Sequence, residues 1–411
     1  MKLICLLLVC LFASCAAFSQ FKTKAQQQTY TNDDSLHAGA SNSKTVVSGY
    51  GSAFYQRDFK LKKSVATLER AVLFVGHQFN EKISFFSELE VENAKVEGGE
   101  QNGAEIAMEQ AFLKFTISPK QYLVAGLFTP RIGILNENHL PVNFNGVERP
   151  LVEQLIIPAT WRELGVAFYG SAANAPVNYS VAVMTGLNSA GFEHGSGIRE
   201  GRAEGNLADA NNLAVTASLQ YFINSFKFQV SGYAGGTVGL NKSSADSLGL
   251  NSGALGTPLY LGEADLQYAK DGFSCKILGT YINYPDAGRV DLAYPKNIAR
   301  AMYGAYAEVG YDWLYRARKS QLLITFVRAE MLDMNSTVPA PPAGIYDGTE
   351  KLRHIIAGLS YLPIPNVVIK ADLRLSHSGP QNPALVVNPP PNALPYQANN
   401  QFLNIGIGYS F

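Results

Sequence analysis

The chain has 411 residues, a net charge of zero and charged side chains at only 16% of its positions. This length exceeds that of an ordinary single soluble domain but suits one large barrel, and the charge balance gives no indication of nucleic-acid binding. The 37 glycines, 21 tyrosines and 22 phenylalanines are typical of many strands that carry aromatic side chains and are separated by glycine-containing turns. Beyond the first residues no stretch has the roughly 18 apolar residues that a membrane helix needs, so the chain spans a bilayer as a barrel or does not span it.

Residues 1–19 have the pattern of a secretory signal peptide, with Lys2 before an apolar stretch and small residues near the cleavage point. We expect the mature chain to begin near Gln20 and to be exported. A lipoprotein acylated at Cys15 is the alternative. After cleavage at Gln20 only Cys275 remains, so no internal disulfide and no cysteine metal site is expected.

Residues 20–43 are polar, rich in glutamine and without periodicity, which predicts a disordered lead-in too short for a globular plug. From residue 44 to 411 the sequence predicts one barrel, because segments of ten or so residues with alternating polarity recur to the end. We expect sixteen strands, at 46–59, 68–79, 82–95, 105–117, 121–129, 162–171, 177–187, 210–223, 225–237, 257–269, 272–283, 300–313, 320–332, 351–362, 366–377 and 401–411.

The connections between these segments alternate in length. After even-numbered segments they are tight, as at 80–81 and 270–271, and after odd-numbered segments they are mostly long, as at 188–209 and 378–400. Short turns on one rim and long loops on the other are typical of outer-membrane barrels. The pattern therefore predicts an all-β fold, a transmembrane antiparallel up-and-down β-barrel of sixteen strands.

Alternation also predicts which charges face the interior. The inward positions of the strands carry many charged side chains. Burying each of them away from water would cost roughly several kcal/mol, so we expect a water-filled lumen. Sixteen strands enclose enough space for an aqueous channel. The candidate residues of the lumen wall are Glu88, Glu90, Lys227, Arg328, Lys370 and Arg374.

The connection at 130–161 differs from the other long ones because it carries charges among many apolar residues. If it is the third external loop, its apolar members would pack against the wall, so we expect it to fold into the barrel and narrow it. The candidate constriction residues are Arg131, Glu148, Arg149, Glu153 and Arg162. Neighbouring opposite charges allow two interpretations, an anion site or ion pairs that only brace the loop.

The last segment, 403–411, places Leu, Ile, Ile, Tyr and Phe on alternate positions and ends on Phe411. Such a terminal strand resembles the signature by which outer-membrane barrels are recognised for insertion. A half-buried strand of a soluble sandwich is the alternative for these nine residues taken alone.

Three motifs resemble the phosphate-selective porin O/P family and related Bacteroidetes outer-membrane porins. They are Gly126-Leu127-Phe128-Thr129-Pro130, Glu148-Arg149-Pro150 and Pro158-Ala159-Thr160-Trp161-Arg162-Glu163-Leu164-Gly165. The resemblance implies a channel, often a homotrimer, that passes ions or small solutes through the bacterial outer membrane. Phosphate selectivity in that family depends on cations that converge on the constriction, whereas here glutamates lie beside the arginines.

The sequence thus predicts an outer-membrane porin in contact with lipid, giving passive and weakly selective diffusion of small hydrophilic solutes or ions, including anions such as phosphate. No enzymatic activity, cofactor, metal site or nucleic-acid partner is expected. One alternative is an adhesin or receptor barrel that binds partners through its long loops. The other is an outer-membrane hydrolase, which would need a nucleophile and a base at one site, whereas the six histidines are scattered along the chain.

Overall fold

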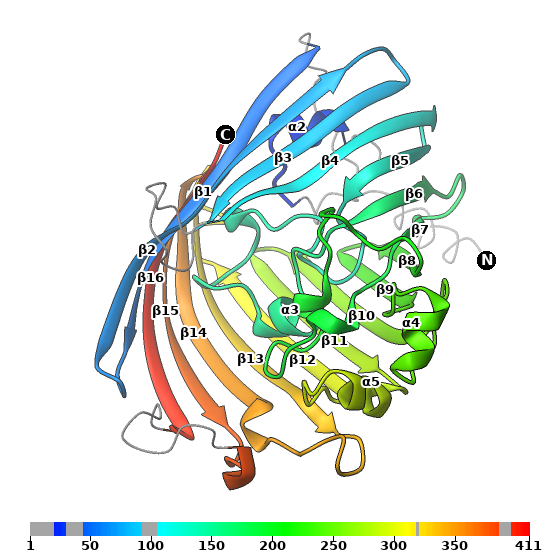
Figure 1. Cartoon of the computed structure of the whole chain (residues 1–411). Coiled ribbons are helices and arrows are strands. Elements are labelled where there is room, and N and C mark those ends of the chain that lie inside the picture. The colour runs from blue at the N-terminus through cyan, green and yellow to red at the C-terminus, as the bar shows by residue number, and fades with distance from the viewer. Residues whose placement is uncertain (1–19, 30–43, 93–104, 318–319, 386–395) are drawn as a thin grey trace, which may run out of the picture.

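The computed structural model describes residues 20–29, 44–92, 105–317, 320–385 and 396–411. The expected signal peptide and residues 30–43 of the expected lead-in lie outside these ranges. The described strands form one closed antiparallel barrel in which each strand pairs with its neighbours in the chain and β1 pairs with β16 (Figure 1). The sixteen strands are β1 Thr45–Asp58, β2 Lys63–Gln78, β3 Ile83–Glu92, β4 Glu105–Ser118, β5 Gln121–Phe128, β6 Glu163–Ser171, β7 Val177–Thr185, β8 Leu213–Ile223, β9 Phe226–Gly235, β10 Leu259–Lys270, β11 Phe273–Asn283, β12 Ala301–Asp312, β13 Leu322–Thr337, β14 Lys351–Ile364, β15 Val367–Ser378 and β16 Asn399–Ser410.

The expected fold class and strand number are confirmed, and two strands are longer than their sequence pattern predicts. Strand β2 begins at Lys63 rather than 68, and β13 continues to Thr337 rather than 332. The extra part of β13 carries Asp333 and Asn335, whose buried polar side chains interrupt the apolar alternation. Each accepts a backbone hydrogen bond, from Asn335 N at 3.0 Å and from Asp347 N at 2.7 Å.

The two faces of the wall have opposite chemistry. Outward positions are apolar and exposed, with Val309, Val327, Ile355, Ile369 and Ile407 between 44% and 55% exposed. Inward positions are polar and buried, as in the run of Thr216, Ser218 and Gln220 on β8. The polarity is thus inverted relative to a protein that folds around an apolar core in water, and it has the alternation of a membrane barrel.

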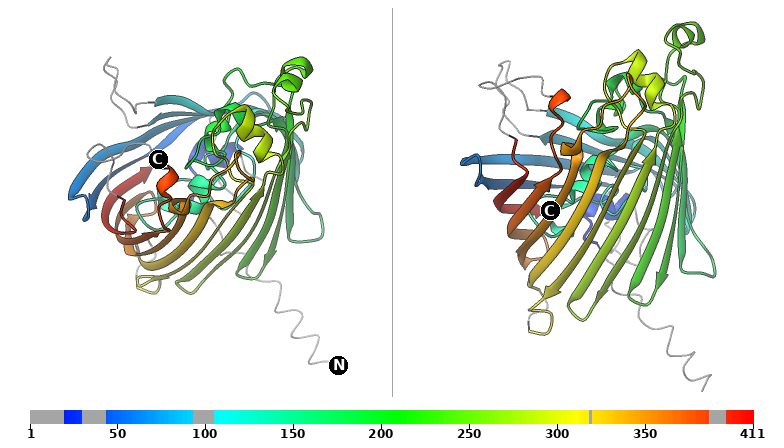
Figure 2. Two further views of the ribbon diagram at one scale, coloured as in Figure 1. Left: turned by 60° about the horizontal axis from the view of Figure 1, so that its bottom comes forward. Right: turned by 90° about the horizontal axis from the view of Figure 1, so that it is seen from below.

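The two rims of the barrel differ in their connections. At the short-turn rim, Asp271 and Gly272 alone join β10 to β11, and both have positive φ, 51° and 81°, as a tight hairpin turn requires. The long-loop rim holds two helices, α4 Lys242–Ser247 and α5 Ala287–Ala293, and three 3₁₀ turns, η3 Ser189–Gly191, η4 Arg199–Gly201 and η5 Gly348–Glu350. A fourth 3₁₀ turn in a long connection is η6 Pro383–Leu385. Figure 2 shows the long connections gathered at one rim and the short turns at the other.

Of the residues that the structure describes, two segments lie inside the barrel. The first is the connection from β5 to β6, which contains the 3₁₀ turn η2 Pro141–Asn143 and the helix α3 Leu151–Leu155. The second is residues 20–29, with the helix α2 Lys24–Thr29, which contacts β1, β2 and β3 (Figure 1). Among the described residues, no helix is both long and apolar enough to cross a lipid bilayer.

The ordered state of residues 20–29 corrects the expectation of a disordered lead-in for this part of 20–43. Ala25 is fully buried, and its N–H donates to Ser48 Oγ of β1 at 3.2 Å. Phe21 N donates to Asn143 Oδ1 at 2.8 Å, and Asn143 Nδ2 donates to Phe21 O at 2.9 Å. These partners lie on the barrel and on its internal loop, far from residues 20–43 in the sequence. No pattern within residues 20–43 therefore predicts that residues 20–29 are ordered.

Candidate functional site

The connection between β5 and β6, residues 129–162, crosses the barrel interior and is called the inner loop below. Its apolar side chains pack against the wall, as expected, with Ile132, Leu135, Ile156 and Ile157 at 0% to 1% exposure. The wall offers glycines where the backbone of the inner loop comes close. A Cβ on Gly304 of β12 would lie 2.8 Å from Val152 Cγ1, and one on Gly408 of β16 would lie closer still to Pro141 Cβ. Larger residues at these two positions would displace the inner loop.

Wall charges hold the backbone of the inner loop on the side of β13 and β15. Lys370 Nζ donates to Phe144 O at 2.8 Å and lies 3.7 Å from the centre of its ring. Arg328 Nη2 donates to Glu148 O at 3.1 Å, and Val147 N donates to Asp372 Oδ2 at 2.7 Å. These wall charges are buried beneath the inner loop.

This arrangement corrects the expectation that Arg328 and Lys370 face water in an open lumen. Arg328, 3% exposed, also pairs through Nε with Glu330 Oε1 at 2.6 Å and through Nη1 with Glu308 Oε2 at 3.3 Å. Arg374 differs, because it forms an ion pair with the carboxylate of Glu148 and its guanidinium lies 4.3 Å from the centre of the Phe402 ring. Inward direction and contact with water are therefore separate properties in this barrel.

Glu153 faces the interior of the inner loop rather than the lumen, which corrects its expected place among the constriction residues. Its carboxylate is fully buried and accepts hydrogen bonds from Ile134 N at 2.9 Å, Leu135 N at 2.7 Å and the Tyr306 hydroxyl at 2.7 Å. Burial raises the pKa of Glu153 to about 7. This residue ties the two halves of the loop to each other and to β12.

Two glutamates of the expected lumen wall lie on β3 and are also covered. Glu90 Oε1 pairs with Arg70 Nη1 at 3.0 Å, and both side chains are below 10% exposed. Glu88 is fully buried and faces His139 of the inner loop, with 3.3 Å between Glu88 Oε1 and His139 Nε2. Glu109 of β4 lies beside them and was not foreseen from the sequence, because alternation does not predict its position.

A cavity of about 240 Å³ lies between the inner loop and the wall on the long-loop side. Its charged lining is balanced, with Arg70, Arg149, Arg162, Arg199 and Arg202 opposite Glu69, Glu90, Glu92, Glu148 and Glu204. Below it is called the outer vestibule. It brings together three of the expected constriction residues, Glu148, Arg149 and Arg162, with wall and loop residues that the sequence analysis did not select.

Most arginines of the outer vestibule have a carboxylate partner. Arg162 Nη2 lies 2.7 Å from Glu204 Oε2, and Arg202 Nη2 lies 2.8 Å from Glu204 Oε1. By contrast, the guanidinium of Arg149 has no hydrogen bond or ion pair with any part of the chain that the structure describes. The Arg149 side chain is nevertheless mostly buried, at 8% exposure, and its charge acts on the nearby carboxylate of Glu69.

Arg131 lies on the opposite side of the inner loop. Its Nε contacts Glu137 Oε2 at 2.7 Å, and its guanidinium lies 5.1 Å from the centre of the Tyr169 ring. With Lys227 and Lys22 it lines a smaller cavity of about 40 Å³ on the short-turn side. Thus Arg131, Arg149 and Arg162 do not converge on one point.

Comparisons with solved structures agree on the fold. The chain is similar to OmpF of Salmonella typhi in complex with daunomycin (11% identity, 89% of this chain and 97% of that one, TM-score 0.51). It is also similar to an anion-selective porin from Comamonas acidovorans (9% identity, 89% of this chain and 99% of that one, TM-score 0.51). A trimer form of OmpT from Vibrio cholerae is similar to the same degree (11% identity, 89% of this chain and 99% of that one, TM-score 0.50). At these identities the likeness establishes the porin barrel fold alone.

No protein-family model matches the chain, so the expected resemblance to the phosphate-selective O/P family has no support from that source. One curated relative is an uncharacterized protein of Aquifex aeolicus strain VF5. It is 30% identical over 346 residues, which cover 79% of this chain and 74% of that protein. The chain therefore belongs to the same family as this Aquifex protein, and its fold is the sixteen-stranded porin barrel.

Proposed function

We propose that the chain is a porin of the bacterial outer membrane that lets small hydrophilic solutes and ions diffuse passively. The observation that carries the proposal is an inverted barrel whose interior is narrowed by the inner loop and keeps a charged vestibule. A continuous band of exposed apolar side chains is unfavourable in water and suits contact with lipid acyl chains. No enzymatic step is part of this proposal.

The inner loop would discriminate first by size. It is bound to the wall by buried hydrogen bonds and apolar contacts, and such a loop gives a fixed opening rather than a fluctuating one. Charge would discriminate second, because fields inside a narrow polar passage act at close range. The ten charged vestibule residues cancel in number, so we propose weak selectivity.

Arg149 favours anions over cations in this scheme, since its guanidinium borders the vestibule without a hydrogen bond or close ion pair among the described residues. Anions such as phosphate belong to the proposed solutes, but the vestibule lacks the converging arginines of a dedicated phosphate site. A homotrimer is part of the proposal, in line with the trimer form of OmpT among the structural neighbours.

Planar-bilayer recording of the purified, folded protein tests the proposal. We expect stepwise conductance, a small reversal potential in a potassium chloride gradient, and entry of small but not large sugars into proteoliposomes. Folded protein that inserts without conductance would overturn the channel and favour a barrel that binds partners through its long loops.

A further inference from the structure

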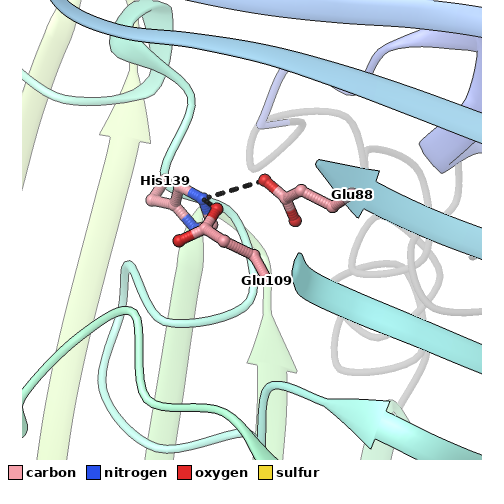
Figure 3. Close-up of side chains that lie close together, drawn as sticks. All are labelled: Glu88, Glu109 and His139. Carbon is pink, nitrogen blue, oxygen red and sulfur yellow. Dashed lines mark ion pairs between the residues drawn. The ribbon is translucent and has the colours of Figure 1, made fainter. Parts of the chain in front are cut away.

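Three buried side chains from separate elements meet between the inner loop and the wall. They are His139 of the inner loop, Glu88 of β3 and Glu109 of β4, and Figure 3 shows both carboxylates directed toward the imidazole. His139 Nε2 lies 3.3 Å from Glu88 Oε1 and 3.4 Å from Glu109 Oε2. The side chains are 3%, 0% and 0% exposed, so water does not screen the two carboxylates.

Each carboxylate turns one oxygen toward the centre of the cluster and the other toward neighbouring side chains, and the central Glu88 Oε1 also accepts from the Tyr50 hydroxyl at 3.5 Å. Glu109 Oε1 accepts from Thr160 Oγ1 at 2.5 Å, and Glu88 Oε2 accepts from Gln110 Nε2 at 2.6 Å. On the inner side, Glu109 Oε2 and His139 Nε2 have no hydrogen-bond partner of acceptable geometry among the described residues. Buried polar atoms without partners are rare and costly in folded proteins, so this pair indicates a missing ligand.

An irregularity of the wall brings Glu109 into the cluster. The register between β3 and β4 shifts here, since Glu88 pairs with Gln110 while Leu89 pairs with Met108. Glu109 is the extra residue of this β-bulge, and consequently both it and Gln110 are buried. Bulges redirect side chains and are frequent next to functional sites.

The spacing fits a metal ion. Two ligands that each lie about 2.1 Å from a tetrahedral zinc ion are roughly 3.4 Å apart, from the bond lengths and the tetrahedral angle. The two nitrogen-to-oxygen distances match this value, and all three ligand atoms lie within 4.8 Å of one another. Two buried carboxylates also need a positive charge nearby, and the guanidinium of Arg162, 3.6 Å from Glu109 Oε1, is shared with Glu204.

We propose that Glu88, Glu109 and His139 bind one divalent transition-metal ion, with Zn²⁺ as the best match to one nitrogen and two oxygen ligands. The ion ties the inner loop to β3 and β4, at a different part of the wall from the anchors on β13 and β15. It is a structural clamp for the inner loop, and it requires neither a conducting channel nor a particular solute.

Protonation of His139 is the alternative way to balance the negative charge of the two carboxylates. Burial lowers the pKa of His139, but the facing carboxylates of Glu109 and Glu88 outweigh it and raise the pKa above its usual value. Metal binding must displace that proton, because a histidine nitrogen binds a metal ion only in its unprotonated form.

The test uses the full folded protein in detergent, stripped with a chelator and titrated with Co²⁺ followed visibly by its d–d absorption. We expect one Co²⁺ per chain, displaced by one Zn²⁺. His139→Gln and Glu109→Gln should each weaken binding more than about 100-fold, because even residues that only orient metal ligands change affinity by about 10- to 100-fold. Far-UV circular dichroism and heat-dependent gel mobility verify that each variant is folded.

Two histidine variants serve as matched controls. His354→Gln removes another buried, inward-facing histidine on β14, and His194→Gln removes the histidine of a second cluster with Asp347 and Glu350 at the long-loop rim. Both should keep the site intact. Absence of Co²⁺ and Zn²⁺ binding in the wild type between pH 6 and 8, or binding that survives both His139→Gln and Glu109→Gln, would overturn the proposal, whatever the conductance of the same preparation.

Discussion

Replacing Glu153 by glutamine should make the stability of the inner loop independent of pH near neutrality. In the wild type, Glu153 Oε2 accepts two backbone N–H groups and Oε1 accepts the Tyr306 hydroxyl. A glutamine can place its oxygen at the two N–H groups and donate from its nitrogen to the Tyr306 oxygen, once that hydroxyl rotates. The variant keeps the three contacts and removes only the charge.

The expected size of the effect follows from the pKa of Glu153. Burial raises it from 4.5 to about 7, and at about 1.4 kcal/mol per pKa unit this corresponds to roughly 3 kcal/mol. Since the pKa in the folded loop lies above that of an exposed glutamate, the stabilisation is fully present below about pH 4.5 and is lost as pH rises to about 7. We therefore expect the closed inner loop to open on the order of 100-fold more often at pH 8 than at pH 4.5.

Hydrogen exchange measured by mass spectrometry gives the opening free energy of the segment around Ile134 and Leu135, after correction for the intrinsic exchange rate. The wild type should lose protection between pH 4.5 and 8, whereas Glu153→Gln should keep it. Glu137→Gln is the control, because Glu137 lies on the same loop with its side chain 23% exposed. An equal pH dependence in wild type and Glu153→Gln would refute the assignment of Glu153 as a buried, protonated brace.

Three further outcomes are expected. Arg149→Gln should shift the reversal potential toward cations, by on the order of 1 kcal/mol in relative permeability, which is the energy of two charges about 4 Å apart in water. Arg131→Gln should shift the reversal potential less, because Arg131 is paired with a carboxylate. Equal shifts in the two variants would contradict the placement of the two residues. Deleting residues 20–29 should raise single-channel conductance without unfolding the barrel, since this segment lies in the interior and takes no part in strand pairing; unchanged conductance would show that the solute path avoids it. Arg328→Met should destabilise the protein by about 3–5 kcal/mol, because it leaves buried carboxylates without their cation, and a thermal-unfolding midpoint equal to that of the wild type would count against this network.

The barrel could be predicted because one physical requirement acts on every strand. Outward positions must be apolar and inward positions polar, and this alternation is visible in stretches such as Lys370 to Ser376. The alternation weakens at strand ends that extend beyond the apolar outer surface of the barrel. For this reason it does not predict the first residues of β2 or the last residues of β13. The apolar residues of the inner loop correctly predicted its packing against the wall.

The environment of the charges could not be predicted in the same way. Alternation gives the direction of a side chain, but it does not say whether another segment covers it. Glu153 and Lys370 both meet loop or wall partners far away in the sequence, and Glu109 faces inward only through a bulge that alternation does not reveal. These contacts depend on the path of the inner loop, which no local pattern encodes.

The same contacts set a limit on selectivity. A charge that holds the inner loop by a buried hydrogen bond has a fixed partner and cannot also exchange partners with passing ions, so Arg328 and Lys370 contribute rigidity rather than ion preference. In the proposed porin, ion preference would then come from charges that border the vestibule and lack such a hydrogen bond. Among the described vestibule arginines Arg149 fits this description best, and one cation in a balanced lining supports only weak discrimination. In the proposed porin, Arg328 and Lys370 would therefore hold the inner loop in place, while charges that border the vestibule would face the solute.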